Sequence, residues 1–361
     1  MPPFQPPPGN GAASYSVIST AGGHTCGISD RGPFCWGAGA SGQLGDAGRD
    51  DHSVPTRVVG SFTADVVDAG TDHTCAVASD GRAFCWGKGS DGRLGNGTSQ
   101  DWLTPALVSD GLLFSSISAG GEHTCGLSGV GFAFCWGRGT GGRLGTGNEL
   151  SRVNPAQVLG GMRFTQISAG AEHTCGVVTG GDAYCWGEGD DGRLGTGNTL
   201  DQSEPTPVLG DLAFAMVSAG ARHTCGVTVA GDAYCWGAGD DGRLGTGTRL
   251  SRSEPKPIAS TLAFRAVSAG QAHSCGVSES GAGFCWGSGK SGRLGTGNEL
   301  DALEPTSVNG TGDFLDIAAA ESHSCGVTRT GSVFCWGDGV DGRLGTGNEI
   351  TRLSAAKVLS S

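Results

Sequence analysis

The residues of this chain that could carry chemistry are cysteines and histidines, which recur in two linked motifs. A His-Thr/Ser-Cys triplet, such as the one ending at Cys75, is followed by Cys-Trp-Gly, such as the one starting at Cys85. Cys-Trp-Gly recurs every 50 residues, and the seven repeats hold all 14 cysteines and seven of the eight histidines. Paired cysteines of this kind form disulfides, pack as reduced thiols in a core, or bind a metal.

The turn between the two cysteines of a repeat decides among these chemistries. In the second repeat, a three-residue hairpin loop with Gly81 in the left-handed position places Cys75 directly opposite Cys85. In the first repeat, a two- or four-residue loop around Asp30 and Arg31 restores this opposition. A metal site needs four ligands, whereas one repeat offers two cysteines and one histidine. We therefore predict disulfides, with reduced core cysteines as the alternative. The predicted pairs are Cys26 with Cys35, Cys75 with Cys85, Cys125 with Cys135, Cys175 with Cys185, Cys225 with Cys235, Cys275 with Cys285, and Cys325 with Cys335.

The third repeat indicates which elements position these motifs. Its short apolar segments are separated by clusters of glycine, asparagine and proline, and they predict strands over residues 114–119, 123–127, 132–136 and 155–159. Pro155 at the start of the fourth strand is typical of an outer edge, where a missing N–H costs little. Four short strands repeated seven times predict an all-β fold, a seven-bladed β-propeller with four antiparallel strands per blade.

The propeller is predicted to be one closed domain over residues 15–361, preceded by a Pro/Gly-rich tail or linker over residues 1–14. A solenoid, the alternative, requires polar capping repeats, whereas the first and last repeats here are as apolar as the middle ones. The sequence leaves open whether every blade is one whole repeat or whether a terminal blade mixes strands from both ends. In either case, residues 15–19 and 357–361 are expected to lie near each other.

The combined pattern Ser-Ala-Gly-x-x-His-Thr-Cys, Cys-Trp-Gly and Gly-Arg-Leu-Gly-Thr-Gly resembles the regulator of chromosome condensation repeat family. The resemblance covers nearly the whole chain and implies a seven-bladed propeller similar to secreted bacterial members with a cysteine pair in each repeat. It implies function only broadly, because members include an exchange factor for a small GTPase, a plant ultraviolet-B photoreceptor and a secreted β-lactamase inhibitor. The absence of tryptophan before the repeat histidines argues against photoreception. Uniform repeat lengths and a negative net charge argue against exchange activity.

Most of the repeated side chains are expected to be structural. The seven motif histidines would lie too far apart to share an ion, and we expect each to hydrogen-bond backbone within its own blade, as the resemblance also implies. The motif tryptophans are expected to pack between blades. The arginines of Gly-Arg-Leu-Gly, replaced by Gln43 in the first repeat, are expected to bind loop carbonyls or neighbouring carboxylates, with an anion-binding ring as the alternative. Asp-Asp pairs at Asp190 and Asp240 suit calcium, but other repeats lack them. We therefore predict no metal site, no cofactor and no catalytic residue.

Residues that break the repeat are the best candidates for partner binding. Trp102 and His52 are the only tryptophan and histidine outside the motifs, and both are predicted to lie in the connection between third and fourth strands of adjacent blades. Strand parity places that connection on the same face as the first-to-second-strand loops, whose charge varies. The variable charged residues there are Asp72, Glu122, Glu172, Arg222 and Glu321. A variable, mainly acidic face with an exposed aromatic indicates a protein-binding surface. The alternative is ordinary drift of solvated loops, with Trp102 folded onto its own blade.

Composition limits the kinds of partner that this protein could bind and the cellular compartments where it could act. The 69 glycines among 361 residues disfavour helices, while 37% hydrophobic content argues against disorder. A net charge of -12 is a poor match to nucleic acid or anionic membrane, and no apolar run predicts a membrane span. The first residues lack the features of a signal peptide, yet seven disulfides would indicate an oxidising compartment.

We therefore predict a non-enzymatic binding or structural propeller that acts outside the cytoplasm, either extracellular, periplasmic or at the cell surface. Its expected partner is a protein, with no nucleic acid and no membrane insertion. The alternatives are an exchange-factor-like regulator of a small GTPase and a lectin or inhibitor-type propeller.

Overall fold

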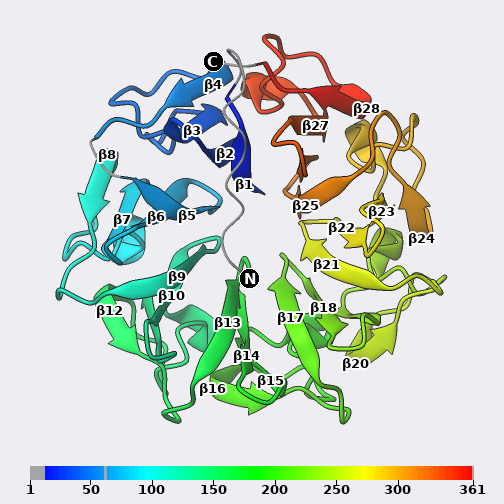
Figure 1. The fold of residues 1–361 in the computed structure, drawn as a ribbon. Coiled ribbons are helices and arrows are strands. Elements are labelled where there is room, and N and C mark those ends of the chain that lie inside the picture. The colour runs from blue at the N-terminus through cyan, green and yellow to red at the C-terminus, as the bar shows by residue number, and fades with distance from the viewer. Residues whose placement is uncertain (1–12, 61–62, 360–361) are drawn as a thin grey trace.

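The computed structural model describes residues 13–60 and 63–359, which form seven four-stranded antiparallel sheets arranged in a ring (Figure 1). Each sheet is one blade built from one contiguous repeat, and its strands follow chain order from the centre outward. The predicted seven-bladed β-propeller is therefore confirmed. Among the described residues, helical structure is limited to short 3-10 turns, and no helix meets the length and apolarity needed to cross a membrane.

The elements fall into five sets by their place in the blade. The innermost strands are β1 (Tyr15–Ala21), β5 (Ala64–Ala69), β9 (Phe114–Ala119), β13 (Phe164–Ala169), β17 (Phe214–Ala219), β21 (Phe264–Ala269) and β25 (Phe314–Ala319). The second strands are β2 (His24–Ser29), β6 (His73–Ala78), β10 (His123–Ser128), β14 (His173–Val178), β18 (His223–Thr228), β22 (His273–Ser278) and β26 (His323–Thr328). The third strands are β3 (Gly32–Gly37), β7 (Ala83–Gly87), β11 (Ala133–Gly137), β15 (Ala183–Gly187), β19 (Ala233–Gly237), β23 (Gly283–Gly287) and β27 (Val333–Gly337). The outermost strands are β4 (His52–Arg57), β8 (Trp102–Leu107), β12 (Arg152–Gln157), β16 (Gln202–Pro207), β20 (Arg252–Pro257), β24 (Ala302–Ser307) and β28 (Arg352–Lys357). The 3-10 turns are η1 (Ser90–Gly92), η2 (Thr140–Gly142), η3 (Asp190–Gly192), η4 (Asp240–Gly242), η5 (Lys290–Gly292) and η6 (Val340–Gly342).

In the third repeat β9 has its predicted bounds, β10 and β11 differ from theirs by one residue at their ends, and the outermost strand differs most. β12 begins at Arg152, and Pro155 lies inside the strand rather than at its start. Gly137 of β11 pairs with Arg152 and Cys135 pairs with Ala156, so the residues between them, Pro155 included, form a bulge. Proline is tolerated there because a bulged residue on an edge strand makes no ladder hydrogen bond.

The cysteines pair as the turn geometry predicts. Cys75 and Cys85 are register partners in β6 and β7, with Cα atoms 4.1 Å apart, and all seven predicted pairs are disulfides. The turn of the second blade has Gly81 at a φ of 85°, in the left-handed region. In the first blade, the two-residue loop between the paired residues Ser29 and Gly32 gives the same opposition. All 14 cysteine side chains are fully buried.

The hydrophobic core is divided among the interfaces between blades. One such cluster joins the Cys75–Cys85 disulfide and Leu94 of the second blade to Ile117 and Trp136 of the third. Equivalent clusters occur at the other interfaces, and each contains a fully buried motif tryptophan. The tryptophans therefore pack between blades as predicted, and no blade buries its core without its neighbour.

The ring closes by packing and not by exchange of strands. Tyr15 and Trp36 of the first blade share a core cluster with Val327 and Val358 of the last, and β1 packs against β25 and β26. The two ends of the propeller are therefore neighbours, and every blade is a whole repeat. Residues 1–12 of the predicted tail and residues 360–361 lie outside the described part of the chain.

The disulfides give a direct chemical prediction. Titration of the denatured, unreduced protein with Ellman's reagent should detect no free thiol, because each cysteine has a cross-strand partner. Reduction before titration is the control and should release all 14 thiols. A full set of free thiols without reduction would contradict the pairing.

Candidate functional site

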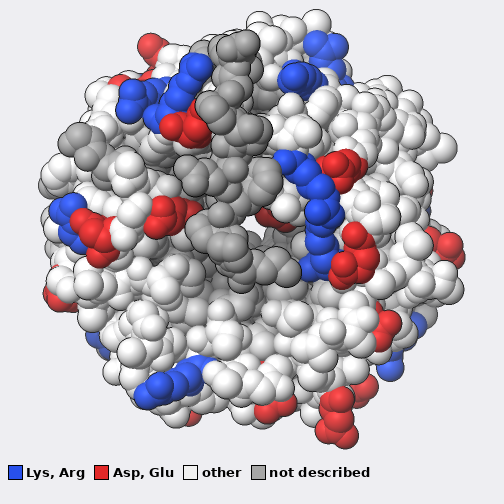
Figure 2. All heavy atoms as spheres, in the orientation of Figure 1, with Lys and Arg blue, Asp and Glu red and all other residues white. Residues whose placement is uncertain are grey.

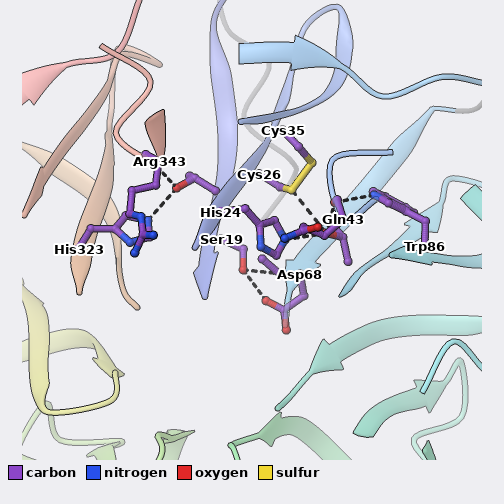
Figure 3. The surroundings of a disulfide bond; sticks show 12 residues. Ser19, His24, Cys26, Cys35, Gln43, Asp68, Trp86, His323 and Arg343 are labelled. Carbon is purple, nitrogen blue, oxygen red and sulfur yellow. Dashed lines mark hydrogen bonds between the residues drawn. A yellow bond between two sulfur atoms is a disulfide. The ribbon is translucent and has the colours of Figure 1, made fainter. Parts of the chain in front are cut away.

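The seven motif histidines lie in the interfaces between blades. Nε2 of His73 is 2.8 Å from Oγ1 of Thr124 in the next blade, and this hydroxyl donates to the carbonyl of Arg93 at 2.8 Å. The indole N–H of Trp136 donates to the same carbonyl at 3.0 Å. The chain from histidine to hydroxyl to carbonyl recurs at all seven interfaces, and we refer to it as the interblade latch. Figure 3 shows the latch on either side of the first blade.

The predicted partner of the histidines is therefore wrong. Each histidine binds a side-chain hydroxyl of the neighbouring blade, not backbone within its own blade. The nearby backbone is already paired, since His123 and Gly137 are partners in the sheet ladder and the His123 carbonyl accepts from Gly120. Nε2 of the ring therefore bonds to the threonine or serine hydroxyl of the next blade.

The latch fixes the protonation state of the histidines. A threonine or serine hydroxyl has one hydrogen, which it donates to the carbonyl, so Nε2 of the histidine must be the donor to that hydroxyl. Nδ1 then carries a lone pair, and at all seven rings it has no hydrogen-bond partner among the described residues. Burial lowers the pKa of His24 to about 4 and of His223 to about 3, and it lowers the pKa of the other five well below the ordinary value. The seven rings are neutral structural groups.

The arginines of Gly-Arg-Leu-Gly lie beside the latch and are nearly buried. Nε of Arg93 donates to the carbonyl of Ser90 at 3.1 Å, and Nη1 donates to the carbonyl of Gly121 in the next blade at 3.1 Å. Carboxylates of Asp91 and Glu122 lie 3.7 and 3.5 Å from its Nη2. The predicted role, binding loop carbonyls and neighbouring carboxylates, therefore describes this position.

The central channel contains two carboxyls that sequence reasoning missed. The innermost strands enclose a cavity of about 550 Å³, and Asp68 and Asp316 are among its lining residues. Asp68 accepts from the hydroxyl of Ser19 at 2.6 Å and from the amide of Ala119 at 2.8 Å. Burial raises the pKa of both carboxyls, that of Asp316 to about 6. The available signal was that Asp68 stands where the other repeats have serine or alanine.

Trp102 and His52 occupy equivalent places in adjacent blades. They are the first residues of β8 and β4, so they open the outermost strands instead of lying in the preceding connection. Trp102 is 42% exposed, whereas Nε2 of His52 is 2.7 Å from a carboxylate oxygen of Asp46. Trp102 is therefore accessible to solvent, whereas His52 is hydrogen-bonded to Asp46 of its own blade.

The charged residues predicted for this face all have partners. Asp72 pairs with Lys88 at 3.1 Å, Glu122 with Arg138 at 2.6 Å, Glu172 with Arg193 at 3.0 Å, Arg222 with Asp191 at 2.8 Å, and Glu321 with the Gln271 side chain at 3.3 Å. Figure 2 shows one face of the ring, on which acidic and basic groups are mixed and separated by wide uncharged areas. The predicted acidic surface is therefore a mosaic in which four of the five residues pair with an opposite charge and Glu321 binds a neutral amide.

Glu188 is a further charged residue of this mosaic that the sequence analysis did not single out. It stands where Lys88 and Arg138 stand in other blades, so at this position Glu172 meets a second carboxyl in place of a base. Their mutual hydrogen bond raises the pKa of Glu188 to about 7 and lowers the pKa of Glu172. Arg193 lies 3.0 and 3.2 Å from the two carboxyls and compensates part of their charge.

Within residues 13–60 and 63–359, no group of three or more His, Cys, Asp or Glu side chains is placed so that it could hold a metal ion. Asp191, half of one Asp-Asp pair considered for calcium, is bound by Arg222 and lies 3.7 Å from Arg193.

Acidification should destabilise the propeller. The folded pKa of each latch histidine lies below the value of about 6.5 for an unfolded histidine, so the unfolded chain takes up protons first as the pH falls through that value. Their stabilisation is complete above about pH 6.5 and is lost below it. Asp68, Asp316 and Glu188, whose pKa values are raised, act in the opposite direction, but seven histidines outnumber three carboxyls.

Guanidinium unfolding curves between about pH 7 and 5 measure this effect. The free energy of unfolding should fall by about 1.4 kcal/mol per pH unit for each histidine not offset by a carboxyl. A free energy that stays constant over this range would contradict the neutral latch.

The sequence matches known repeat families. The profile of the RCC1-like domain matches residues 115–360. Profiles of the regulator of chromosome condensation (RCC1) repeat match residues 34–77, 80–127 and 65–93. A comparison with curated proteins finds no match.

Solved structures with the same fold include several propellers. Human WBSCR16 is 22% identical with a TM-score of 0.81, over 90% of this chain and 93% of that chain. Yeast RCC1 (Prp20), solved bound to Kap60, is 20% identical with a TM-score of 0.80, over 96% and 85%. The ectodomain of the Arabidopsis thaliana receptor kinase ACR4 is 21% identical with a TM-score of 0.56, over 91% and 97%. At these identities the likeness concerns the fold alone.

Three observations now agree: seven copies of one motif set, a closed ring of seven four-stranded blades, and a profile match over most of the propeller. The chain belongs to the RCC1-like domain family.

Proposed function

We propose that this propeller is a non-enzymatic binding module that holds a protein partner on the face of the first-to-second-strand loops. The observation that carries the proposal is the exposure of Trp102 on that face. In the six other blades, the residue at the equivalent position is histidine, arginine, glutamine or alanine. The exposed indole therefore occurs only in the second blade. Exposed tryptophans ringed by polar groups dominate many protein interfaces.

The surroundings of Trp102 suit such a contact. The carboxylate of Asp101, the preceding residue, accepts a hydrogen bond from the amide of Gly89 at 3.0 Å. It also lies 3.5 Å from the guanidinium of Arg49 in the first blade. These contacts hold the loop in place before a partner arrives, which lowers the entropy cost of binding. The partner would meet an aromatic side chain on a fixed loop with paired charges around it.

The disulfides favour a location outside the reducing cytoplasm. Disulfides persist in secreted, periplasmic and cell-surface proteins and are rare where thiols are kept reduced. The same fold occurs in the ectodomain of ACR4, although it also occurs in yeast RCC1. We therefore place the module in an extracellular or periplasmic compartment or at the cell surface.

The Trp102→Ala variant tests the proposed face. With a partner identified by capture and mass spectrometry, the variant should bind at least about tenfold more weakly, because truncation removes the central aromatic contact. Leu113→Ala is the control, since Leu113 is 56% exposed and precedes β9 on the opposite face. Both variants should keep the melting temperature of the wild type. Equal affinity of Trp102→Ala and wild type would remove this face from the binding site.

A further inference from the structure

The arginines of the Gly-Arg-Leu-Gly motif differ in the carboxylate that pairs with each guanidinium. In four blades the aspartate two residues before the arginine faces its Nη2. These pairs are Asp91 with Arg93 at 3.7 Å, Asp191 with Arg193 at 3.7 Å, Asp241 with Arg243 at 3.2 Å, and Asp341 with Arg343 at 2.7 Å. In the third blade that position is Gly141, and Glu122 lies 3.7 Å from Arg143 instead.

Arg293 in the sixth blade has no such partner: among residues 13–60 and 63–359, no carboxylate oxygen lies within 4 Å of it. Every position that supplies a carboxylate to another arginine holds a small neutral residue around Arg293. These positions are Ser291, Ser288, Ala272 and Ser322. The arginine is nonetheless 7% exposed, so it is a buried cation that lacks the internal compensation of its equivalents.

The guanidinium is held in one orientation. Nε donates to the carbonyl of Lys290 at 2.9 Å, and Nη1 donates to the carbonyl of Glu321 at 2.9 Å. These bonds use two of its three nitrogens and leave Nη2, the atom that meets aspartate in four other blades. Lys290 is exposed and adds a second positive charge at the same loop.

We propose that Arg293 and Lys290 form a binding site for a single carboxylate presented by the protein partner. A carboxylate suits the site because it would accept from Nη2 as Asp241 and Asp341 do in two other blades, and a charge-assisted bond to a buried guanidinium is stronger than a neutral one. The hydroxyls of Ser288 and Ser291 stand nearby in sequence as further donors. The proposal rests on the proposed function only in naming a protein as the source of the carboxylate.

The surroundings favour an isolated carboxylate over a polyanion. Asp338, Glu321 and Asp241 act on Arg293 from beyond pairing distance and favour its charged form, while burial lowers its pKa. These same acids would repel a ligand carrying many negative charges. The expected ligand is therefore one glutamate or aspartate flanked by neutral or basic residues, which also excludes nucleic acid.

The repeat supplies a matched pair of test variants. Ser291 has a φ of 57°, and the four equivalent aspartates have φ between 58° and 61°, so aspartate fits this backbone without rearrangement. Ser291→Asp should fill the site with an internal carboxylate. Ser291→Asn has nearly the same shape without the charge, and asparagine also tolerates this conformation.

The experiment is an NMR titration of the intact protein with two acetylated, amidated peptides, Lys-Gly-Glu-Gly-Lys and Lys-Gly-Gln-Gly-Lys, following the arginine Nε–H signals. The glutamate peptide should shift one signal saturably, and the glutamine peptide should not. The Ser291→Asp variant should bind the glutamate peptide at least tenfold more weakly than wild type. The affinity of the Ser291→Asn variant should stay within about twofold of wild type.

Two results would overturn the site: equal shifts from both peptides, or equal affinity of the Ser291→Asp and Ser291→Asn variants for the glutamate peptide. The Trp102→Ala variant should bind the peptide as wild type does. Failure of the carboxylate site and failure of the proposed tryptophan face are therefore distinguishable.

Discussion

The propeller depends on one hydrogen-bonded chain, in which a histidine of one blade donates to a hydroxyl of the next blade, which donates back to a carbonyl of the first. At the second interface the groups are His73, Thr124 and the Arg93 carbonyl. The chain has a single direction because the hydroxyl has only one hydrogen. Repeated seven times, with the last link from His323 to Thr25, it closes the ring without exchange of strands between the chain ends.

The disulfides stabilise single blades, and the latch stabilises the contacts between blades. A disulfide such as that of Cys75 and Cys85 joins two strands within one blade, while the latch and Trp136 join that blade to the next. Both sets of contacts are fully buried, so the loops outside them vary without disturbing the frame. This explains how Trp102 and Arg293 can be particular to single blades while the backbone repeats.

The fold could be predicted from the sequence because its determinants are local and occur seven times. The turn at Gly81 sets the register of one hairpin, and that register alone places Cys75 opposite Cys85. The histidine partner could not be predicted, since it depends on how neighbouring blades pack, and Thr124 lies 51 residues from His73. The binding surface was predictable only in part. Trp102 stands out as a break in the repeat, but the bases that pair with Glu122 and Glu172, and the missing counter-ion of Arg293, become visible only when the blades are assembled.

The tautomer of the buried histidines tests the latch most directly. Long-range proton–nitrogen NMR correlations of the imidazole rings at neutral pH distinguish the two neutral tautomers and the charged form. All seven motif histidines are predicted to be neutral and protonated on Nε2, with a bare Nδ1. Signals typical of the Nδ1-protonated tautomer or of imidazolium at these positions would contradict the latch as the interaction that closes the ring.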